Sequence, residues 1–282
     1  MAPRPREADG RPRRLIVNAD DFGRSAAVNQ AVVRAHREGI LTTASLMVNE
    51  AGFDEAAALA REHPTLGVGL HLTLACGHAA LPPEVIPGLV NANGEFRCGS
   101  TSAGVRYFFR SNLRDQLRQE IHAQFQKFHA AHLPLDHVNG HLHLHLHPTV
   151  FSILMADTAQ LGLKRLRLTF DPLRLNLRLA SGHFAYRALH AAMFHPLAAR
   201  ARPALARRGI QHTDAVFGLL QNARVDETYI TRLLPRLPAG DSELYCHPSL
   251  DESRHEFEAL ISHHVRDQIR QLGIQLIRYQ DL

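Results

Sequence analysis

The sequence predicts an α/β protein, most simply a (β/α) barrel or a distorted relative of one with seven or eight strands. Three observations favour this class. Short apolar runs alternate along the chain with segments of helical periodicity, as expected for parallel strands joined by helices. The 282 residues, of which 45% are hydrophobic, suffice for one domain with a substantial core. Seven or eight strand–helix units fit a barrel better than an open sheet.

The elements expected in the first half begin at residue 14. The apolar run 14–18 is typical of a short buried strand. Ser25 can cap the following helix, and Gly39 ends it. Residues 76–104 are rich in Pro and Gly and predict a loop, after which Ser111 precedes a long helix. Between these elements we expect strands at 40–48 and 66–74 and a helix at 54–63.

The second half continues the same alternation. A helix is expected from Pro148 to Leu161, because Gly162 follows as a stop signal. We interpret the segment 164–208, which interleaves Arg with Leu, Phe and Tyr, separately below. The other expected elements are strands at 135–145, 164–169, 213–218, 242–247 and 274–278 and helices at 226–234 and 254–272.

The charge is distributed unevenly. Of the formal net charge of +5, residues 1–14 contribute +3 and residues 164–208 contribute +9, which leaves −7 for the rest of the chain. We expect residues 1–13 to be a disordered basic tail and residues 14–282 to be a single domain. The basic apolar segment 164–208 suits contact with an anionic membrane or an amphiphilic substrate, but an ordinary amphipathic strand and helix with a solvated Arg face explains it equally.

Several classes of protein are excluded or disfavoured. No apolar run is long enough for a transmembrane helix, and the basic N-terminus lacks the apolar core of a secretory signal. Cys76, Cys98 and Cys246 are far apart without a CxxC motif, which favours a reduced, cytoplasmic protein. Nucleic-acid binding is disfavoured by the acidic body and the absence of a recognised motif. The sequence also contains no phosphate-binding GxGxxG or GxxxxGK[ST] motif.

Adjacent carboxylates follow the first predicted strand. Asp20 and Asp21 lie at its carboxyl end, which is the active-site face of a β/α barrel. Because successive side chains diverge, one carboxylate can bind a metal while the other faces a bound water. The alternative is a loop that caps the next helix. A second candidate is His71, which follows Gly67 and Gly69 in an apolar strand and is either a ligand or a core histidine.

The strongest signal is a run of alternating histidines before Pro148. On a strand, these histidines would share one face. Packing does not readily explain such a face, whereas neutral imidazole is the commonest metal ligand. An HxH pair can chelate one ion, and the later histidines then support the site, face the substrate or cap the next helix. One Asp and two His suit a single divalent ion, Zn²⁺ before Mg²⁺, Co²⁺ or Ni²⁺. The histidines concerned are His141, His143, His145 and His147.

A fourth candidate lies at the end of the strand expected at 242–247. Cys246 and His247 are neighbours there, which would suit a thiol protease if their side chains could meet. Neighbours on a strand point to opposite faces, so they cannot form a nucleophile–base pair directly. We therefore interpret His247 as a separate acid or base on the same rim. The GxSxG and HExxH motifs are absent.

With these motifs the chain resembles the YdjC/ChbG carbohydrate deacetylase family. The resemblance rests on residues 15–23 (Leu-Ile-Val-Asn-Ala-Asp-Asp-Phe-Gly), 69–72, 141–143 and 246–248 (Cys-His-Pro), which occur in the family's order over about residues 15–280. It implies a TIM-barrel-related deacetylase fold and removal of acetyl from an N-acetylated sugar with one divalent metal ion. The resemblance implies Asp20 as general base, Asp21, His71 and His141 as metal ligands, and His247 as general acid.

One departure from the family pattern concerns the histidine run. Leu142 stands where some members have His, so His141 and His143 both remain candidates for the ligand. His143 and His145 are then additional ligands or substrate-facing residues. The sequence does not fix the oligomeric state, and a homodimer is compatible with it.

Within the family, the sequence most resembles the hopanoid-biosynthesis-associated branch, HpnK. The supporting stretches are 39–47, 82–90 and 135–148. This implies N-acetylglucosamine linked to bacteriohopanetetrol as substrate, and a cytoplasmic enzyme that is peripheral at the inner membrane if the basic segment touches lipid. The alternatives are a deacetylase of a soluble chitooligosaccharide or other N-acetylated sugar, a metal-dependent phosphoesterase, and a metal-storage or sensing protein.

Overall fold

The computed structural model describes residues 10–221 and 223–282. Residues 1–9 of the expected tail lie outside that part, and Arg13, the last residue of the expected tail, already opens the first strand. The strands form one parallel sheet with the order β4-β3-β2-β1-β6-β5, and β7 pairs with the beginning of β1. The strands are β1 (Arg13–Phe22), β2 (Thr43–Leu46), β3 (Gly67–Leu72), β4 (Val138–Gly140), β5 (Ala215–Phe217), β6 (Gly240–Cys246) and β7 (Gln275–Leu276).

An irregular segment joins the two ends of this sheet. The strand expected at 164–169 is not regular, but the backbone of residues 164–170 hydrogen bonds to Val138 of β4 on one side and to Gln211 and Val216 on the other. Isolated parallel bridges pair Leu166 with Val138 and Arg165 with Gln211. The sheet therefore curls into a distorted barrel, which confirms the predicted α/β, (β/α) barrel-like fold.

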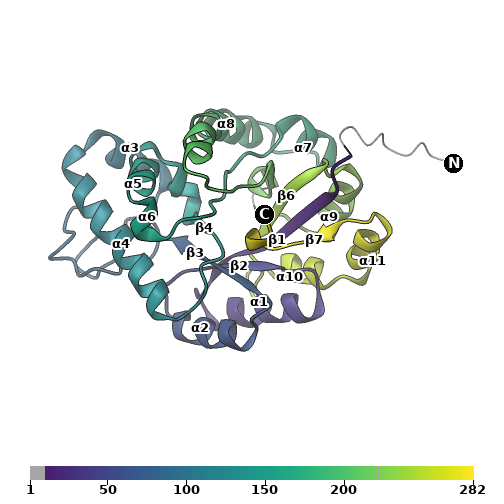
Figure 1. The fold of residues 1–282 in the computed structure, drawn as a ribbon, viewed down its shortest axis with the longest axis horizontal. Coiled ribbons are helices and arrows are strands. Elements are labelled where there is room, and N and C mark those ends of the chain that lie inside the picture. Colours follow the sequence, from purple (N-terminus) through teal and green to yellow (C-terminus); the bar gives the residue numbers. More distant parts are fainter. Residues whose placement is uncertain (1–9, 222) are drawn as a thin grey trace.

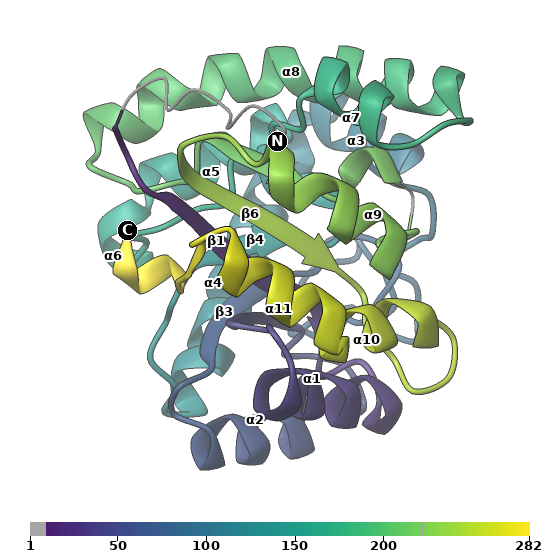
Figure 2. The same cartoon turned by 90° about the vertical axis from the view of Figure 1, so that its right-hand side faces the viewer.

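Helices surround the sheet on its outer side (Figures 1 and 2). Ser25 caps the first of them as expected, because its hydroxyl accepts a hydrogen bond from the Val28 amide. The helix expected at 254–272 is two helices, because Ser262 breaks it and caps the second. The helices are α1 (Ala26–Glu38), α2 (Phe53–Glu62), α3 (Ser100–Phe109), α4 (Arg114–Ala130), α5 (Pro148–Ala156), α6 (Thr158–Leu161), α7 (Leu173–Leu179), α8 (Phe184–Arg207), α9 (Glu227–Leu233), α10 (Arg254–Ile261) and α11 (His263–Gln271).

The prediction of a strand over 135–145 was wrong beyond Gly140. At His141 the chain enters a tight turn, η2 (His141–Leu146), in which Leu142 and His143 take the left-handed conformation with φ of 54° and 57°. The histidines of this run therefore do not share one strand face. Their alternation with leucine imitates a strand pattern, but the turn sends successive side chains in different directions.

From residue 173 onward the basic apolar segment is helical rather than strand and helix. The run 173–179 forms α7, and residues 184–207 form the long helix α8. In Figure 1, α8 lies along one side of the barrel, with α7 beside it. In the part of the chain that the structure describes, no helix is both long and apolar enough to cross a bilayer.

Candidate metal and catalytic site

The sequence-predicted site residues gather at the carboxyl ends of the strands. β1, β3, β6 and the turn after β4 bring their polar residues to a pocket of about 220 Å³. Parallel strands place their carboxyl ends at the same edge, where β/α barrels carry their active sites. The pocket is lined by Asp20, His71, His141, Leu142, His143, Tyr186, His190, Met193, Phe194, Gly218, Leu219, Ala223, Tyr245 and His247.

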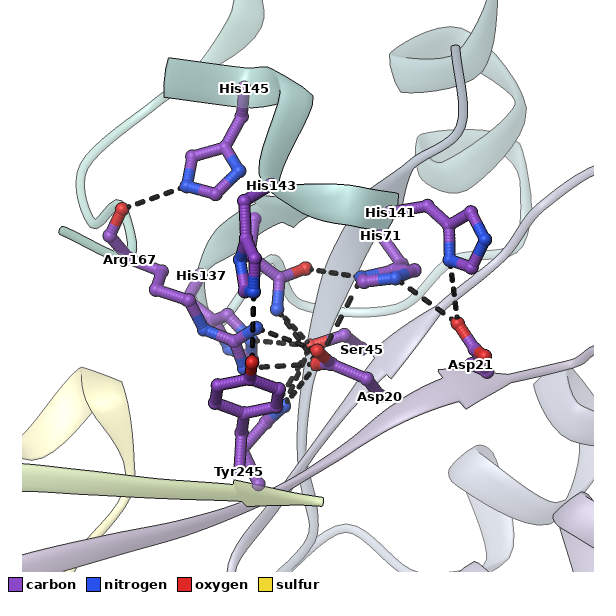
Figure 3. Close-up of polar contacts among 12 residues, drawn as sticks. Asp20, Asp21, Ser45, His71, His137, His141, His143, His145, Arg167 and Tyr245 are labelled. Atoms are coloured by element: carbon purple, nitrogen blue, oxygen red, sulfur yellow. Dashed lines mark hydrogen bonds and ion pairs between the residues drawn. The ribbon is translucent and has the colours of Figure 1, made fainter. Parts of the chain in front are cut away.

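Three side chains converge at one side of this pocket (Figure 3). Oδ1 of Asp21 lies 3.2 Å from Nε2 of His71 and 3.1 Å from Nδ1 of His141. The three donor atoms all lie within 4.8 Å of one another, close enough to share one ion. Two imidazole nitrogens and one carboxylate oxygen are a donor set suited to zinc, with positions left for water and substrate. The residues present therefore fit a divalent cation.

Electrostatics within this group favour the charged carboxylate. Burial disfavours ionisation, but the hydrogen bond from His141 holds the pKa of Asp21 well below its usual value. Burial likewise opposes a charged His141, yet the hydrogen bond and charge of Asp21 raise the pKa of this imidazole. The carboxylate thus stays available as a ligand at neutral pH.

A distortion of β1 separates the two aspartates. Asp21 has a positive φ of 64°, and the pairing of β1 with β2 shifts register between Ala19 and Phe22. A non-glycine residue in this conformation is strained, and such strain and β-bulges concentrate at functional sites. As a result, the carboxylate of Asp21 points to His71 and His141, whereas that of Asp20 points into the barrel (Figure 3).

The orientation of His71 is fixed by Asn139. The Nδ2 amide of Asn139 donates to Oδ1 of Asp20 at 3.0 Å and to Oγ of Ser45 at 2.8 Å, so its Oδ1 faces Nδ1 of His71 at 2.7 Å. An amide oxygen only accepts, so Nδ1 of His71 carries the proton and Nε2 keeps its lone pair. That nitrogen is the one directed at Asp21.

We expect Asn139→Ala to weaken metal binding by about 10–100-fold, because a ligand imidazole loses the partner that sets its tautomer. Titration of the metal-stripped protein with Zn²⁺ would measure this change. Asn176→Ala, which removes a buried amide that bonds Asp171 and Gln221 and none of the three ligands, serves as the matched control. Equal affinity of the Asn139 variant and the wild type would show that the amide does not orient His71.

Asp20 is held by a bidentate ion pair. Arg167 donates from Nη1 to Oδ2 at 2.7 Å and from Nη2 to Oδ1 at 2.9 Å. Oδ1 also accepts from Asn18 at 2.8 Å and from Asn139, whereas Oδ2 accepts from Arg167 alone among the described residues. Burial opposes ionisation of Asp20, but the charge of Arg167 outweighs it and lowers the pKa well below the usual value. Asp20 is therefore an anion, and Oδ2 has a lone pair left for a proton.

Arg167 is the central cation of the barrel interior. It is fully buried, and besides Asp20 it contacts Glu243, with Nη2 at 2.6 Å from Oε1. Its guanidinium lies over the ring of Tyr245 at 4.4 Å, and the hydroxyl of Tyr279 donates to Oε2 of Glu243 at 2.5 Å. Two buried carboxylates thus share one arginine, which satisfies charges that would otherwise be costly to bury.

His247 lines the same pocket and directly follows Cys246, the last residue of β6, which pairs with Ala19 of β1. Its side chain is 36% exposed, and its Nδ1 is 3.9 Å from Oε2 of the buried Glu256. The backbone amide of His247 donates to the same carboxylate. Its neighbour Cys246 is buried, and burial raises the pKa of this thiol well above its usual value. The cysteine does not line the pocket, in agreement with the interpretation of His247 as a separate acid or base.

The other histidines of the run have three different environments. His143 lines the pocket and its Nε2 lies 2.9 Å from the Tyr245 hydroxyl, and burial holds its pKa well below the usual value. His145 is buried, with a pKa lowered to about 3 by burial, and its Nε2 donates to the Arg167 carbonyl at 3.0 Å. His147 caps α5 by accepting from the Thr149 amide. His143 thus faces the pocket, whereas His145 does not, and neither belongs to the converging metal group.

Sequence reasoning missed the groups that support the ligands and Asp20. Asn139 lies two residues before the histidine run and was given no role, and Arg167 was counted as part of a basic segment. Glu243 and Tyr245 were not singled out either. A signal was present for two of them, because Arg167 and Glu243 are charged residues at positions expected to be buried in a barrel strand.

The wall opposite the ligands is apolar and aromatic. Tyr186, His190 and Phe194 line the pocket from α8, with the rings of Tyr186 and His190 3.8 Å apart. Gly218, Leu219 and Ala223 complete this wall. Asp171 links α7 to this wall, because it accepts from Asn176 of α7 and from the Leu220 amide at 3.0 Å. Tyr186 and Arg187 of α8 donate to the Leu219 and Leu220 carbonyls, so Asp171 is one of several groups that fasten the wall.

The buried carboxyl group of Asp171 should make the free energy of unfolding depend on pH. Burial raises its pKa to about 7, against hydrogen bonds from Leu220 and Asn176 and the charge of Arg187. Between about pH 4 and 7 the folded chain binds more protons at this site than the unfolded one, so the free energy of unfolding falls as pH rises, by up to roughly 4 kcal/mol. We expect Asp171→Asn to flatten this slope. Denaturant unfolding at pH 4.5 to 8 checks it, and an unchanged slope would contradict it.

Comparison with known proteins places this site in a family. The chain matches the YdjC-like protein family over residues 14–271. A carbohydrate deacetylase of Brevibacillus brevis is 45% identical over 142 residues, 50% of this chain and 54% of the relative. A carbohydrate deacetylase of Geobacillus stearothermophilus is 42% identical over 167 residues, 58% of this chain and 64% of the relative. These two matches span between 54% and 64% of the relatives' own lengths.

Two further similarities extend over nearly the whole chain. A chitooligosaccharide deacetylase of Serratia marcescens is 29% identical over 275 residues, 95% of this chain and 98% of the relative. A solved structure from Enterococcus faecalis V583, described as a putative cellobiose-phosphate cleavage protein, has a TM-score of 0.74 and 24% identity, covering 96% of this chain and 98% of that one. The latter shows the shared fold. Because the family match includes all the converging site residues, the chain belongs to the YdjC-like family.

Proposed function

We propose that this protein is a metal-dependent carbohydrate N-deacetylase. One observation carries the proposal: the Asp21, His71 and His141 donor atoms converge at the side of the pocket that a separate, ionised Asp20 lines together with the two histidines. A site with a metal position and an adjacent ionised carboxylate suits hydrolysis of an unactivated amide. The names of the curated relatives supply the class of substrate, an N-acetylated sugar.

In the proposed mechanism, Asp21, His71 and His141 would hold a divalent cation, Zn²⁺ by their donor set, which would supply Lewis acidity at the acetamide carbonyl. Asp20 accepts a proton from the attacking water at Oδ2, the oxygen that accepts from Arg167 alone among the described residues. Arg167 and Asn139 hold the carboxylate in place during this transfer. His247 donates a proton to the departing nitrogen. The amide and water thereby give an amine and acetate.

For the finer identity of the substrate, we propose N-acetylglucosamine linked to a hopanoid lipid. The apolar and aromatic wall formed by Tyr186, Phe194 and Met193 suits the face of a pyranose ring and the start of an apolar aglycone. Resemblance to the hopanoid-associated branch points to the same class. The alternative is a soluble chitooligosaccharide, the substrate class in the name of the Serratia marcescens relative.

The pocket favours this chemistry over phosphate-ester hydrolysis. Its lining, over the described residues, includes neither arginine nor lysine, and Arg167 lies below Asp20 rather than on the pocket surface. A phosphoryl group would need such cations near the metal. The lining instead suits a neutral amide and an apolar group.

Mass spectrometry separates the two substrate classes. The Zn²⁺-loaded protein is incubated with N-acetylglucosaminyl bacteriohopanetetrol and, in parallel, with N,N′-diacetylchitobiose. We expect loss of one acetyl group from the glycolipid at a kcat/KM above that for chitobiose. Activity on chitobiose alone would replace the lipid-linked substrate with the soluble one. Loss of acetyl from neither would contradict the proposed function.

A further inference from the structure

We propose that the face around the pocket entrance docks on an anionic lipid bilayer. Ten large hydrophobic residues are exposed in the part of the chain that the structure describes, and eight of them lie on α3, η2, α7 and α8. The largest exposed fractions belong to Phe109 at 76%, Leu189 at 67% and Phe184 at 64%. Scattered exposed apolar residues are ordinary, but this concentration on neighbouring elements is typical of an interaction surface.

The elements that carry these side chains meet at the pocket. α3 and α8 both contact η2, the turn that supplies His141 and His143 to the site. The ring of Phe108 packs edge-on against His147 at 6.3 Å, directly after that turn. Leu142 and Met193 are exposed and also line the pocket. The apolar surface therefore borders the pocket entrance.

The positive charge of the same elements favours an anionic bilayer as the ligand of this surface. Residues 96–114 contain four arginines and residues 172–213 contain seven, and neither stretch contains a carboxylate side chain. Arg110, Arg174 and Arg178 are exposed beside the apolar side chains. Arginine and aromatic side chains together suit the headgroup region of an anionic bilayer. A second copy of this positive face would be repelled electrostatically, so we favour lipid over self-association.

This docking would serve the proposed function. With the entrance against the bilayer, the sugar of an amphiphilic substrate could enter the pocket while its apolar part stays in the membrane. That consequence rests on the proposed function, whereas the docking itself rests only on the surface. The surface includes α3, and this helix lies outside the basic segment 164–208.

Vesicle binding of the full chain tests the proposal. We expect the wild type to sediment with phosphatidylcholine–phosphatidylglycerol vesicles at low salt, and to do so much less with phosphatidylcholine alone. The double variants Phe108→Ser/Phe109→Ser and Phe184→Ser/Leu189→Ser should each lose on the order of tenfold in partitioning. The matched control is Val85→Ser/Leu276→Ser, which removes exposed apolar side chains outside the surface and should bind as the wild type does.

Two outcomes would overturn the proposal. One is a wild-type protein that does not bind anionic vesicles. The other is a surface double variant that binds vesicles normally but changes oligomeric state, as measured by light scattering, which would assign the face to a second copy. Acetate release from a water-soluble N-acetyl substrate tests the deacetylase activity independently of membrane docking. Released acetate without vesicle binding contradicts docking only, and vesicle binding without acetate contradicts the chemistry only.

Discussion

Replacing Asp20 with asparagine is expected to lower kcat by about 10²–10⁴-fold while the protein still binds one metal ion per chain. The amide cannot take the proton that Oδ2 accepts in the proposed mechanism. Metal binding should survive because Asp20 is not one of the converging donors, and its Oδ1 lies 4.0 Å from Nδ1 of His71. Turnover and metal content measured on the same preparation check both parts.

The control for this variant is Asp157→Asn. Asp157 is also a buried carboxylate in a bidentate pair with an arginine, Arg118, but it lies outside the pocket. We expect this control to keep the wild-type turnover. Near-wild-type turnover of Asp20→Asn would remove Asp20 as the general base, and loss of metal from the variant would place it among the ligands.

The second large effect concerns stability. Arg167→Met should lower the free energy of unfolding by about 3–5 kcal/mol, because it leaves the carboxylates of Asp20 and Glu243 buried without their shared cation. Arg165→Met is the matched control, two residues away, where the side chain is partly exposed and donates to a backbone carbonyl. Denaturant unfolding measures both variants. Equal stability of the two would show that the buried pairs contribute little.

The residues that bear the chemistry were predictable because they stand directly after strand-like runs. Asp20, Asp21 and His71 follow or end apolar segments, and parallel strands bring such positions to one edge without any knowledge of long-range contacts. The barrel-like fold was predictable for the same reason, since strand–helix alternation is a local signal. In the structure β1 pairs regularly with β6, and β3 pairs regularly with β2, whereas β1 shifts register against β2 at the two aspartates.

The turn after β4 was not predictable from its pattern. Alternating histidine and leucine favour a strand, but the left-handed Leu142 and His143 depend on contacts made by residues far away in sequence. His141 reaches Asp21, and His145 reaches the Arg167 carbonyl. Because these partners come from other strands, the local alternation could not distinguish a strand from a turn.

The supporting charges escaped prediction for a related reason. Arg167 is separated from Asp20 by 147 residues and from Glu243 by 76. A charged residue alone is expected at the surface, and only the presence of both partners makes its burial favourable. The segment 164–208 therefore combines two buried cations, Arg167 and Arg187, with the exposed arginines of α7 and α8, and its net charge alone cannot distinguish them.

The most direct test of the central claim is acetate release by one protein sample carried through metal removal and restoration. We expect the sample to hold one divalent ion per chain, to stop releasing acetate from an N-acetylglucosaminyl substrate when a chelator removes the ion, and to recover with Zn²⁺. The His71→Ala variant should neither hold the ion nor recover. Undiminished acetate release from the metal-free protein, or full recovery of His71→Ala, would contradict the account.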